Sequence, residues 1–159
     1  MAKKEVKTDL WVYDLLKQAE IQLDAQGSNI KEIDDALKTA SKKGTGNVGF
    51  TEYVGVVKDY LLVIEDKAAL DKHIKLDDKN CISIEANAVR DYAVNGALFY
   101  AKHLARNTTY KKILAFGVSG DEKKHKISPL YVDETEFYRE FPEVQSFISF
   151  NEDNIDEYY

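Results

Sequence analysis

The chain has 159 residues and a mass of 18.1 kDa, the size of one ordinary domain. Its residues are 44% hydrophobic and 31% charged, a balance that excludes a disordered or fibrous chain. The single cysteine, Cys81, excludes an internal disulfide and an all-cysteine zinc site. Residues 1–5 are charged and show no signal-peptide pattern, so we expect a soluble domain of the cytoplasm.

The net charge of −6 is concentrated near the C-terminal end of the sequence. Residues 133–159 hold nine acidic residues and one basic residue, whereas residues 1–132 carry 21 basic and 19 acidic residues. A body so close to neutrality neither indicates nor excludes nucleic-acid binding. We expect a folded domain over residues 1–132 and an acidic segment over residues 133–159 that connects it to further domains.

Two helices are predicted at the beginning of the chain. Residues 8–25 place apolar side chains three and four positions apart, and Thr8 is suited to cap the helix. A second, shorter helix is expected from Ser28 or Asn29 to about residue 40. The glycine-rich residues 41–49 have the composition of a loop.

A β-hairpin is the next predicted element. Residues 51–57 are rich in β-branched and aromatic side chains, residues 60–64 are nearly all apolar, and Lys58 and Asp59 form the turn. The order of helices and strands along the chain predicts an α/β sandwich, a mixed central sheet flanked by helices. The remaining predicted elements are a polar loop over 68–80, a short extended piece over 82–84, a long helix over 85–106, strands over 113–118 and 126–132, and a last short strand over 147–150.

The hairpin register brings charged side chains together at its open end. With a turn at residues 58–59, Glu52 lies directly opposite Glu65, and opposed residues point to the same side of a sheet with Cβ atoms about 4.5–5.5 Å apart. Lys67 shares that side because it lies two residues beyond Glu65, whereas the side chain of Asp66 points away. One face of the hairpin is therefore expected to carry two carboxylates and an ammonium group.

Two opposed carboxylates repel each other, so such a pair indicates a compensating cation. Hard cations such as Mg²⁺ bind carboxylate oxygens together with water and substrate phosphate. A lysine beside this metal can orient the attacking water and stabilise developing charge. The arrangement therefore favours hydrolysis of phosphodiester bonds.

These residues resemble the PD-(D/E)xK superfamily of restriction and repair nucleases. Thr51 and Glu52 stand in the place of Pro-Asp, and Glu65, Asp66 and Lys67 stand in the place of (D/E)-x-K. The resemblance implies a restriction-endonuclease-like sandwich with an αβββαβ-type core.

The sequence around the motif, over residues 49–54, 64–68 and 91–101, is similar to the N-terminal nuclease region of type I-like and type IIG restriction-modification enzymes. In such enzymes an adenine-specific DNA methyltransferase region often follows. The resemblance thus implies double-stranded DNA as substrate and further methyltransferase or specificity domains, or subunits, as partners.

Site residues are also implied by this resemblance. Glu52 and Glu65 would be metal ligands, the backbone carbonyl of Asp66 a further ligand, and Lys67 the catalytic lysine. Glu20 on the first helix would be a supporting acid, because many members of the superfamily place one there. The implied cofactor is Mg²⁺, with Mn²⁺ as a substitute.

Three alternatives remain open from the sequence. The domain could be a non-catalytic DNA- or protein-binding member of the same fold, or a DNA repair nuclease. It could also be an unrelated α/β interaction domain whose hairpin charges only decorate the surface. Asp59 competes with Glu52 for the role of metal ligand, although aspartate is also common in turns. The nuclease interpretation requires Glu52 and Glu65 to be neighbours on one face of the sheet.

Overall fold

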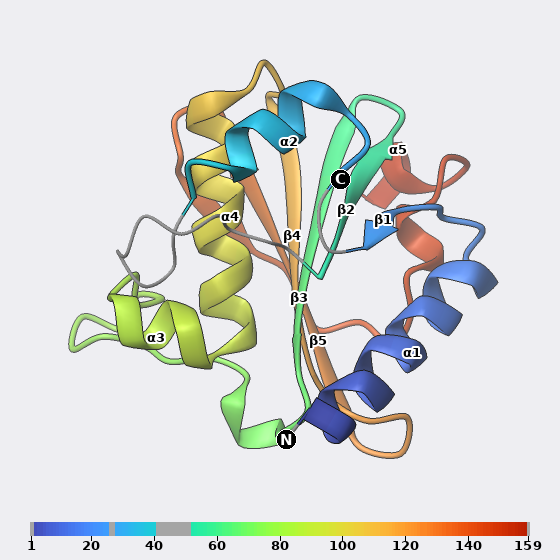
Figure 1. Cartoon of the computed structure of the whole chain (residues 1–159), viewed down its shortest axis with the longest axis vertical. Helices are drawn as coiled ribbons and strands as arrows, with labels where there is room; N and C mark the ends of the chain where they lie inside the picture. The colour runs from blue at the N-terminus through green and yellow to red at the C-terminus, as the bar shows by residue number, and fades with distance from the viewer. Residues whose placement is uncertain (1, 26–27, 41–51, 159) are drawn as a thin grey trace.

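A computed structural model describes residues 2–25, 28–40 and 52–158. Its centre is a six-stranded sheet with the spatial order β1-β2-β3-β4-β5-β6, and helices cover both faces (Figure 1). The helices and strands are α1 (Ala2–Gln18), β1 (Asp24–Ala25), α2 (Lys31–Leu37), β2 (Tyr53–Val57), β3 (Tyr60–Lys67), the 3-10 helix η1 (Leu70–Lys72), α3 (Ala86–Asp91), α4 (Ala93–Asn107), β4 (Lys112–Gly120), β5 (His125–Asp133), β6 (Tyr138–Glu140), the 3-10 helix η2 (Ile148–Phe150) and α5 (Ile155–Tyr158).

The sheet is mixed, as the sequence predicts. Strands β3 and β4 run parallel, and all other neighbouring strands run antiparallel. A parallel pair needs a long crossover, and the 15-residue helix α4 forms part of it. Helix α1, strands β1 to β3, helix α4 and strand β4 follow one another in the order of an αβββαβ core, with α2 and α3 added between them. The expected fold class is therefore confirmed.

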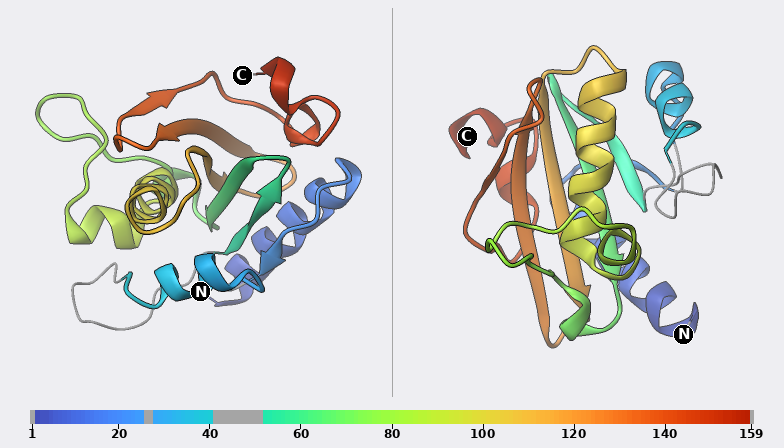
Figure 2. Two further views of the ribbon diagram at one scale, coloured as in Figure 1. Left: turned by 90° about the horizontal axis from the view of Figure 1, so that it is seen from above. Right: turned by 90° about the vertical axis from the view of Figure 1, so that its left-hand side faces the viewer.

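Two hydrophobic layers separate the sheet from its helices. Helices α2 and α4 pack on one face, where Leu61 and Val63 of β3 are fully buried. Helix α1 and the C-terminal residues pack on the other face, against Leu62 and Ile64 of the same strand. Figure 2 shows α4 and α1 on opposite sides of the strands. Because β3 is buried on both faces, its sequence over residues 60–64 is a continuous apolar run.

The helices differ in several places from the sequence prediction. Helix α1 ends at Gln18 and not at residue 25, because residues 24–25 form strand β1. Helix α1 already begins at Ala2, so Thr8 is not an N-cap; its hydroxyl is buried and donates to the carbonyl of Gly120 at 2.9 Å. The helix expected over 85–106 is broken at Tyr92, whose extended backbone (φ −120°, ψ 138°) separates α3 from α4. Periodicity continues across this break, which is why the sequence did not reveal it.

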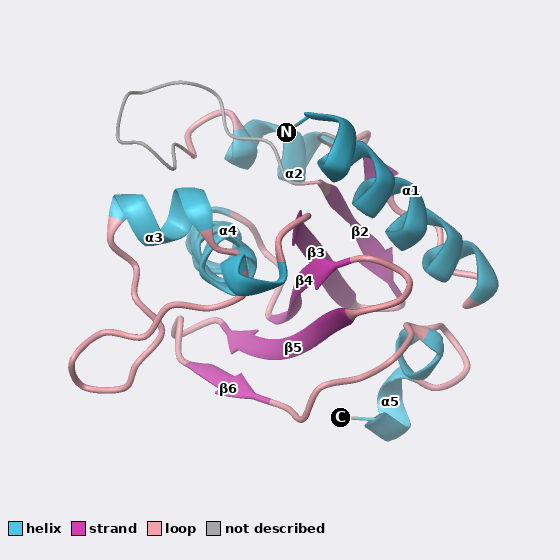
Figure 3. Ribbon diagram, turned by 90° about the horizontal axis from the view of Figure 1, so that it is seen from below, coloured by secondary structure: helices cyan, strands magenta, loops and turns pink. Residues whose placement is uncertain are grey.

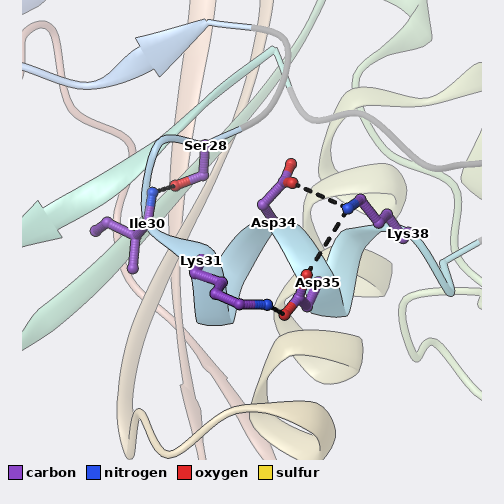
Figure 4. Close-up of polar contacts among 6 residues, drawn as sticks. All are labelled: Ser28, Ile30, Lys31, Asp34, Asp35 and Lys38. Carbon is purple, nitrogen blue, oxygen red and sulfur yellow. Dashed lines mark hydrogen bonds and ion pairs between the residues drawn. The ribbon is translucent and has the colours of Figure 1, made fainter.

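Helix α2 is short and is stabilised by local polar contacts (Figure 4). The hydroxyl of Ser28 accepts a hydrogen bond from the Ile30 amide at 3.0 Å just before the first turn. Lys31 contacts Asp35 at 2.7 Å along the exposed side, an i,i+4 pair. These contacts stabilise the helix locally while Ile33 and Leu37 face the core.

Residues 133–158 pack against the body of the domain. Strand β6 pairs with β5, and Phe147 and Phe150 are fully buried against Phe116. The short strand expected over 147–150 is instead part of a 3-10 turn, η2, followed by α5 beside the sheet (Figure 3). The segment expected as a connection therefore contributes to the hydrophobic core, and its link to further domains stays a prediction.

In the described part of the chain, every helix is too short or too polar to cross a membrane.

Candidate metal centre

The C-terminal end of β3 presents acidic side chains to both faces of the sheet. The hairpin register is the one predicted, with Val57 opposite Tyr60 and Tyr53 opposite Ile64. Side chains alternate along a strand, so Glu65 continues the face covered by α4 and Asp66 continues the face covered by α1. Both residues are only 2% exposed.

On the α1 face, three carboxylates converge. Asp9 of α1, Glu52 before β2 and Asp66 of β3 each offer an oxygen atom, and these atoms lie within 4.8 Å of one another. Within the described residues, no hydrogen-bond donor reaches either oxygen of Asp66 or Oδ1 of Asp9. Buried carboxylate oxygens without partners are costly, because burial removes the water that would otherwise solvate them.

Electrostatics at this position disfavour ionised Asp66. Burial raises the pKa of the Asp66 carboxyl far above its ordinary value, and the adjacent Asp9 carboxyl raises it further. The negative charges of Glu52 and Glu65 act in the same direction. Asp66 therefore needs either a proton or a cation, and a divalent cation would neutralise several of these carboxylates together.

Two hydrogen bonds fix the N-terminal half of α1 over the acids. The hydroxyl of Tyr53 donates to the backbone carbonyl of Asp9 at 2.7 Å, and the hydroxyl of Thr8 donates to Gly120. Burial raises the pKa of Tyr53, as do the charges of Asp9 and Asp66, so its hydroxyl keeps its proton. The position of Asp9 is thus set by the sheet and not by α1 alone.

On the α4 face, Glu65 is held by tight packing and by a backbone hydrogen bond. Its Oε2 accepts from the amide of Glu52 at 3.0 Å. The first turn of α4 lies directly above it, since a Cβ on Gly96 would be 3.4 Å from Glu65 Oε1. Gly117 on β4 permits this approach, because a Cβ there would meet the backbone of Val94 at 2.6 Å. Glu52 therefore contacts Glu65 through its backbone and the acids of the α1 face through its side chain.

Lys67 lies at the end of the same strand beside a buried polar network. It is partly exposed and has Ser119 as its register partner on β4. The hydroxyl of Ser119 lies 2.7 Å from Nδ1 of His73, and Nε2 of that imidazole lies 2.7 Å from the hydroxyl of Ser128. The carbonyl of His73 accepts from the amide of Val94 at 2.8 Å. This network ties the loop that follows Lys67 to β4, β5 and the start of α4.

The structure brings most of the sequence-predicted residues to one end of the hairpin. Glu52, Glu65, Asp66 and Lys67 all lie there. The side chain of Asp66 points away from Glu65, as expected, but the carboxylate of Glu52 lies with it and with Asp9 on the α1 face. The expectation that Glu52 and Glu65 share one face is therefore wrong for their side chains, although the two residues are neighbours through the backbone hydrogen bond. The carboxylates that converge are those of Asp9, Glu52 and Asp66. Thr51 lies outside the described residues.

Two other candidate acids lie elsewhere. Glu20 follows the C-terminal end of α1, where it is exposed with a positive φ of 61°; it is eleven residues from Asp9 on the same segment. Asp59 is in the turn at the opposite end of the hairpin and pairs with Lys112 at 3.0 Å.

Asp9 is the acid of this centre that the sequence analysis missed. A helix beginning at residue 8 would place it in the first turn, where acidic residues are common. The available signal was its spacing, because Asp9 continues the buried stripe of Val12 and Leu16 by one helical turn. A carboxylate in line with a buried stripe faces the protein interior and requires a partner there.

The donor set is suited to a hard divalent cation. All three side chains of the α1-face cluster offer carboxylate oxygens, the ligands that Mg²⁺ and Mn²⁺ prefer. The partnerless oxygens of Asp66 point into that cluster. The residues present therefore fit a metal ion.

Comparison with known proteins gives one strong similarity. The chain is 35% identical over 161 aligned positions, its whole length, to RM.BcgI of Heyndrickxia coagulans, a type II restriction enzyme and methyltransferase. It spans about a quarter of that protein. No protein-family model matches the chain, and no solved structure matches it. The chain is thus related in sequence to part of a restriction-modification enzyme.

Proposed function

We propose that this chain is the DNA-cleaving part of a restriction-modification enzyme and that it hydrolyses phosphodiester bonds with a divalent metal, Mg²⁺ or Mn²⁺. One observation carries the proposal: a buried carboxylate without partners, Asp66, faces Asp9 and Glu52 beside the Glu65-x-Lys67 motif. The similarity of the whole chain to a restriction enzyme and methyltransferase supports it.

Each residue has a separate role in this proposal. Glu52, Asp66 and Asp9 would hold the metal, and Glu65 fixes Glu52 by accepting its amide hydrogen bond. When bound, such a metal polarises the phosphoryl oxygen and lowers the pKa of water. Lys67 lies on the face of Glu65 at the last position of β3, and at that strand end it would orient the attacking water and stabilise negative charge that develops on the phosphate.

The pattern-based ligand set is kept as a second version of the same site. In that set Glu52 and Glu65 bind the metal together with the backbone carbonyl of Asp66, and Asp9 rather than Glu20 supplies the acid from the first helix. The two versions share Glu52 and Lys67. They differ in whether the side chain of Asp66 or that of Glu65 contacts the metal.

Double-stranded DNA in the cytoplasm is the proposed substrate, and methyltransferase and target-recognition domains are the proposed partners. The body over residues 1–132 has a net charge of only +2. Phosphate contacts supply most non-specific DNA affinity, so a nearly neutral body would depend on other domains for binding. Residues 133–159 would lead towards those domains after completing the core.

A cleavage assay with a matched acid control tests the proposal. Plasmid DNA at low salt is incubated with the wild-type chain, Glu52→Gln and Glu20→Gln, each with Mg²⁺ or Mn²⁺. We expect nicking by the wild type and by Glu20→Gln, and none by Glu52→Gln. Metal-independent nicking, or equal rates for all three proteins, would overturn the nuclease proposal. Metal-dependent retention of a short duplex without any nicking would favour the non-catalytic DNA-binding alternative.

A further inference from the structure

Helix α1 has an apolar stripe on its outer face. Its inner face packs on the sheet through Val12 and Leu16, yet Val6, Leu10 and Tyr13 are 52%, 59% and 51% exposed. These three residues follow i, i+4, i+7 spacing, so they lie along one side of the helix. Scattered exposed hydrophobic residues are ordinary, but a stripe at helical spacing is typical of a helix that packs against a partner.

Charges of opposite sign border this stripe on one flank. Lys7 and Asp14 are exposed and lie seven residues apart, which places them on the same side of the helix about two turns from each other. Both line an open groove of about 500 Å³ between α1 and the turn joining β4 to β5, where Asp121 and Lys123 also lie. The flank that carries Lys7 and Asp14 is therefore open and is not covered by another part of the described chain.

The pattern is self-complementary for an antiparallel helix pair. When a two-fold axis relates two antiparallel helices, the same flank of each helix faces its copy. The register that packs Leu10 against Tyr13 of a second copy then sets Lys7 nearest to Asp14 of that copy, twice by symmetry. The alternative register, Leu10 against Val6, would set Lys7 against Lys7.

We propose that the outer face of α1, formed by Val6, Lys7, Leu10, Tyr13 and Asp14, is a docking surface for a second copy of this chain, and that the two α1 helices pair antiparallel. The Lys7–Asp14 contacts fix the orientation, as charged flank positions do in coiled coils. Two short helices bury less than the roughly 1,200 Å² of a stable interface, so the pair is weak and concentration-dependent.

The proposal extends beyond nuclease chemistry and does not depend on it. A single hydrolytic centre opens one phosphodiester bond, whereas a duplex has two strands. An antiparallel pair of α1 helices would bring two copies of the centre together, since Asp9 lies on the same helix as Leu10. The pairing can be measured without DNA or metal, so its failure is separate from a failure of the nuclease proposal.

Charge reversal across the proposed contact provides the test. Sedimentation equilibrium of the intact chain up to millimolar concentration is expected to show a monomer–dimer equilibrium. Lys7→Asp alone and Asp14→Lys alone should each weaken dimerisation at least about tenfold, because each creates two like-charge contacts. The double variant, Lys7→Asp with Asp14→Lys, should restore dimerisation to near the wild-type level, and Leu10→Asp should abolish it.

A matched pair on another helix controls for general charge effects. Lys31→Asp with Asp35→Lys exchanges an exposed ion pair on α2 and should leave the dimer unchanged. Circular dichroism verifies that each variant is folded. A wild type that stays monomeric at all concentrations would overturn the proposal. So would a double variant that remains as weak as the single variants, even if the wild type dimerises through another surface.

Discussion

Two neighbouring buried acids, Glu65 and Asp66, lie on opposite faces of β3 and differ in their hydrogen bonding. On the α4 face, Glu65 accepts a backbone hydrogen bond, and nearby His73 and Ser119 are bonded to each other. On the α1 face, Asp66 is equally buried, but no hydrogen-bond donor among the described residues reaches either of its carboxylate oxygens. Folded proteins satisfy nearly all buried polar groups, so the α4 face has the contacts of structural support, whereas the acids of the α1 face could hold a cation.

The α4 face positions the end of β3 by packing, whereas the α1 face carries the converging carboxylates. Gly96 and Gly117 allow α4 to lie against Glu65, so this face is closely packed. On the opposite face, α1 contributes Asp9, and hydrogen bonds of Tyr53 and Thr8 fix this helix to the sheet. The predictions below test whether the faces can be disturbed independently.

The largest effect is expected at Lys67. Lys67→Ala should lower the DNA-cleavage rate on the order of 10²–10⁴-fold, because a group that acts on the attacking water is removed. Metal binding should remain, since the acids are unchanged. Lys72→Ala, a lysine of η1, is the matched control and should cleave at close to the wild-type rate. Equal rates for the two variants would contradict a catalytic role for Lys67.

Disturbing the packed face should reduce stability. Gly117→Ala forces a Cβ to within 2.6 Å of the backbone of Val94, so the start of α4 must shift. We expect a loss of about 3 kcal/mol in the free energy of unfolding, measured by urea denaturation. Gly96→Ala should change stability much less, because helix propensity gains about 1 kcal/mol and offsets its milder contacts. A larger loss at Gly96 would contradict the described packing of α4.

The same face should give the protein a pH dependence through His73. Burial lowers the pKa of His73 to about 4, from 6.5, and the charge of Lys126 acts in the same direction. The unfolded chain therefore binds a proton that the folded chain does not, and stability falls as pH decreases from 6.5 towards 4. The loss at His73 should approach about 3 kcal/mol over that range. Urea denaturation of His73→Leu at several pH values should show a free energy of unfolding that falls less steeply between pH 6.5 and 4 than that of the wild type. An equally steep fall in the variant would exclude His73 as the source of the pH dependence.

The smallest expected effect is a gain in stability from a substitution on the α1 face. Asp66→Asn removes a buried carboxylate that burial and its neighbours disfavour, so the metal-free variant should be about 1–2 kcal/mol more stable than the wild type. Added Mg²⁺ should stabilise the wild type and leave the variant unchanged. Thermal unfolding with and without Mg²⁺ measures both quantities. A destabilised variant would show that Asp66 is already satisfied in the metal-free protein.

Much of the fold could be predicted from the sequence because local patterns determine it. The β-branched strands and the turn at residues 58–59 define the hairpin register, and with it the opposite directions of Glu65 and Asp66. Thr8 could not be placed, because its partner, Gly120, is 112 residues away. Likewise, the burial of Phe147 depends on contact with Phe116 and not on its own neighbours.

The candidate site was predictable only on the hairpin. The directions of Glu65 and Asp66 follow from strand periodicity, which is a local property. The same periodicity placed Glu52 on the face of Glu65, whereas its carboxylate lies with Asp9 and Asp66 on the α1 face. Asp9 comes to Asp66 through the docking of α1 on the sheet, and no local pattern specifies that distance. Glu20 was chosen as the supporting acid on the first helix, but the structure places it past the end of that helix.

Calorimetric titration with Mg²⁺ tests the central claim most directly, namely that the acids of the α1 face hold a metal. The wild type, Glu20→Gln, Asp9→Asn and Asp66→Asn are compared with a short DNA duplex present, after circular dichroism verifies folding. The account predicts binding to the wild type and to Glu20→Gln, and strongly weakened binding to the other two. Binding that is equal in all four proteins, or absent from the wild type, would contradict it.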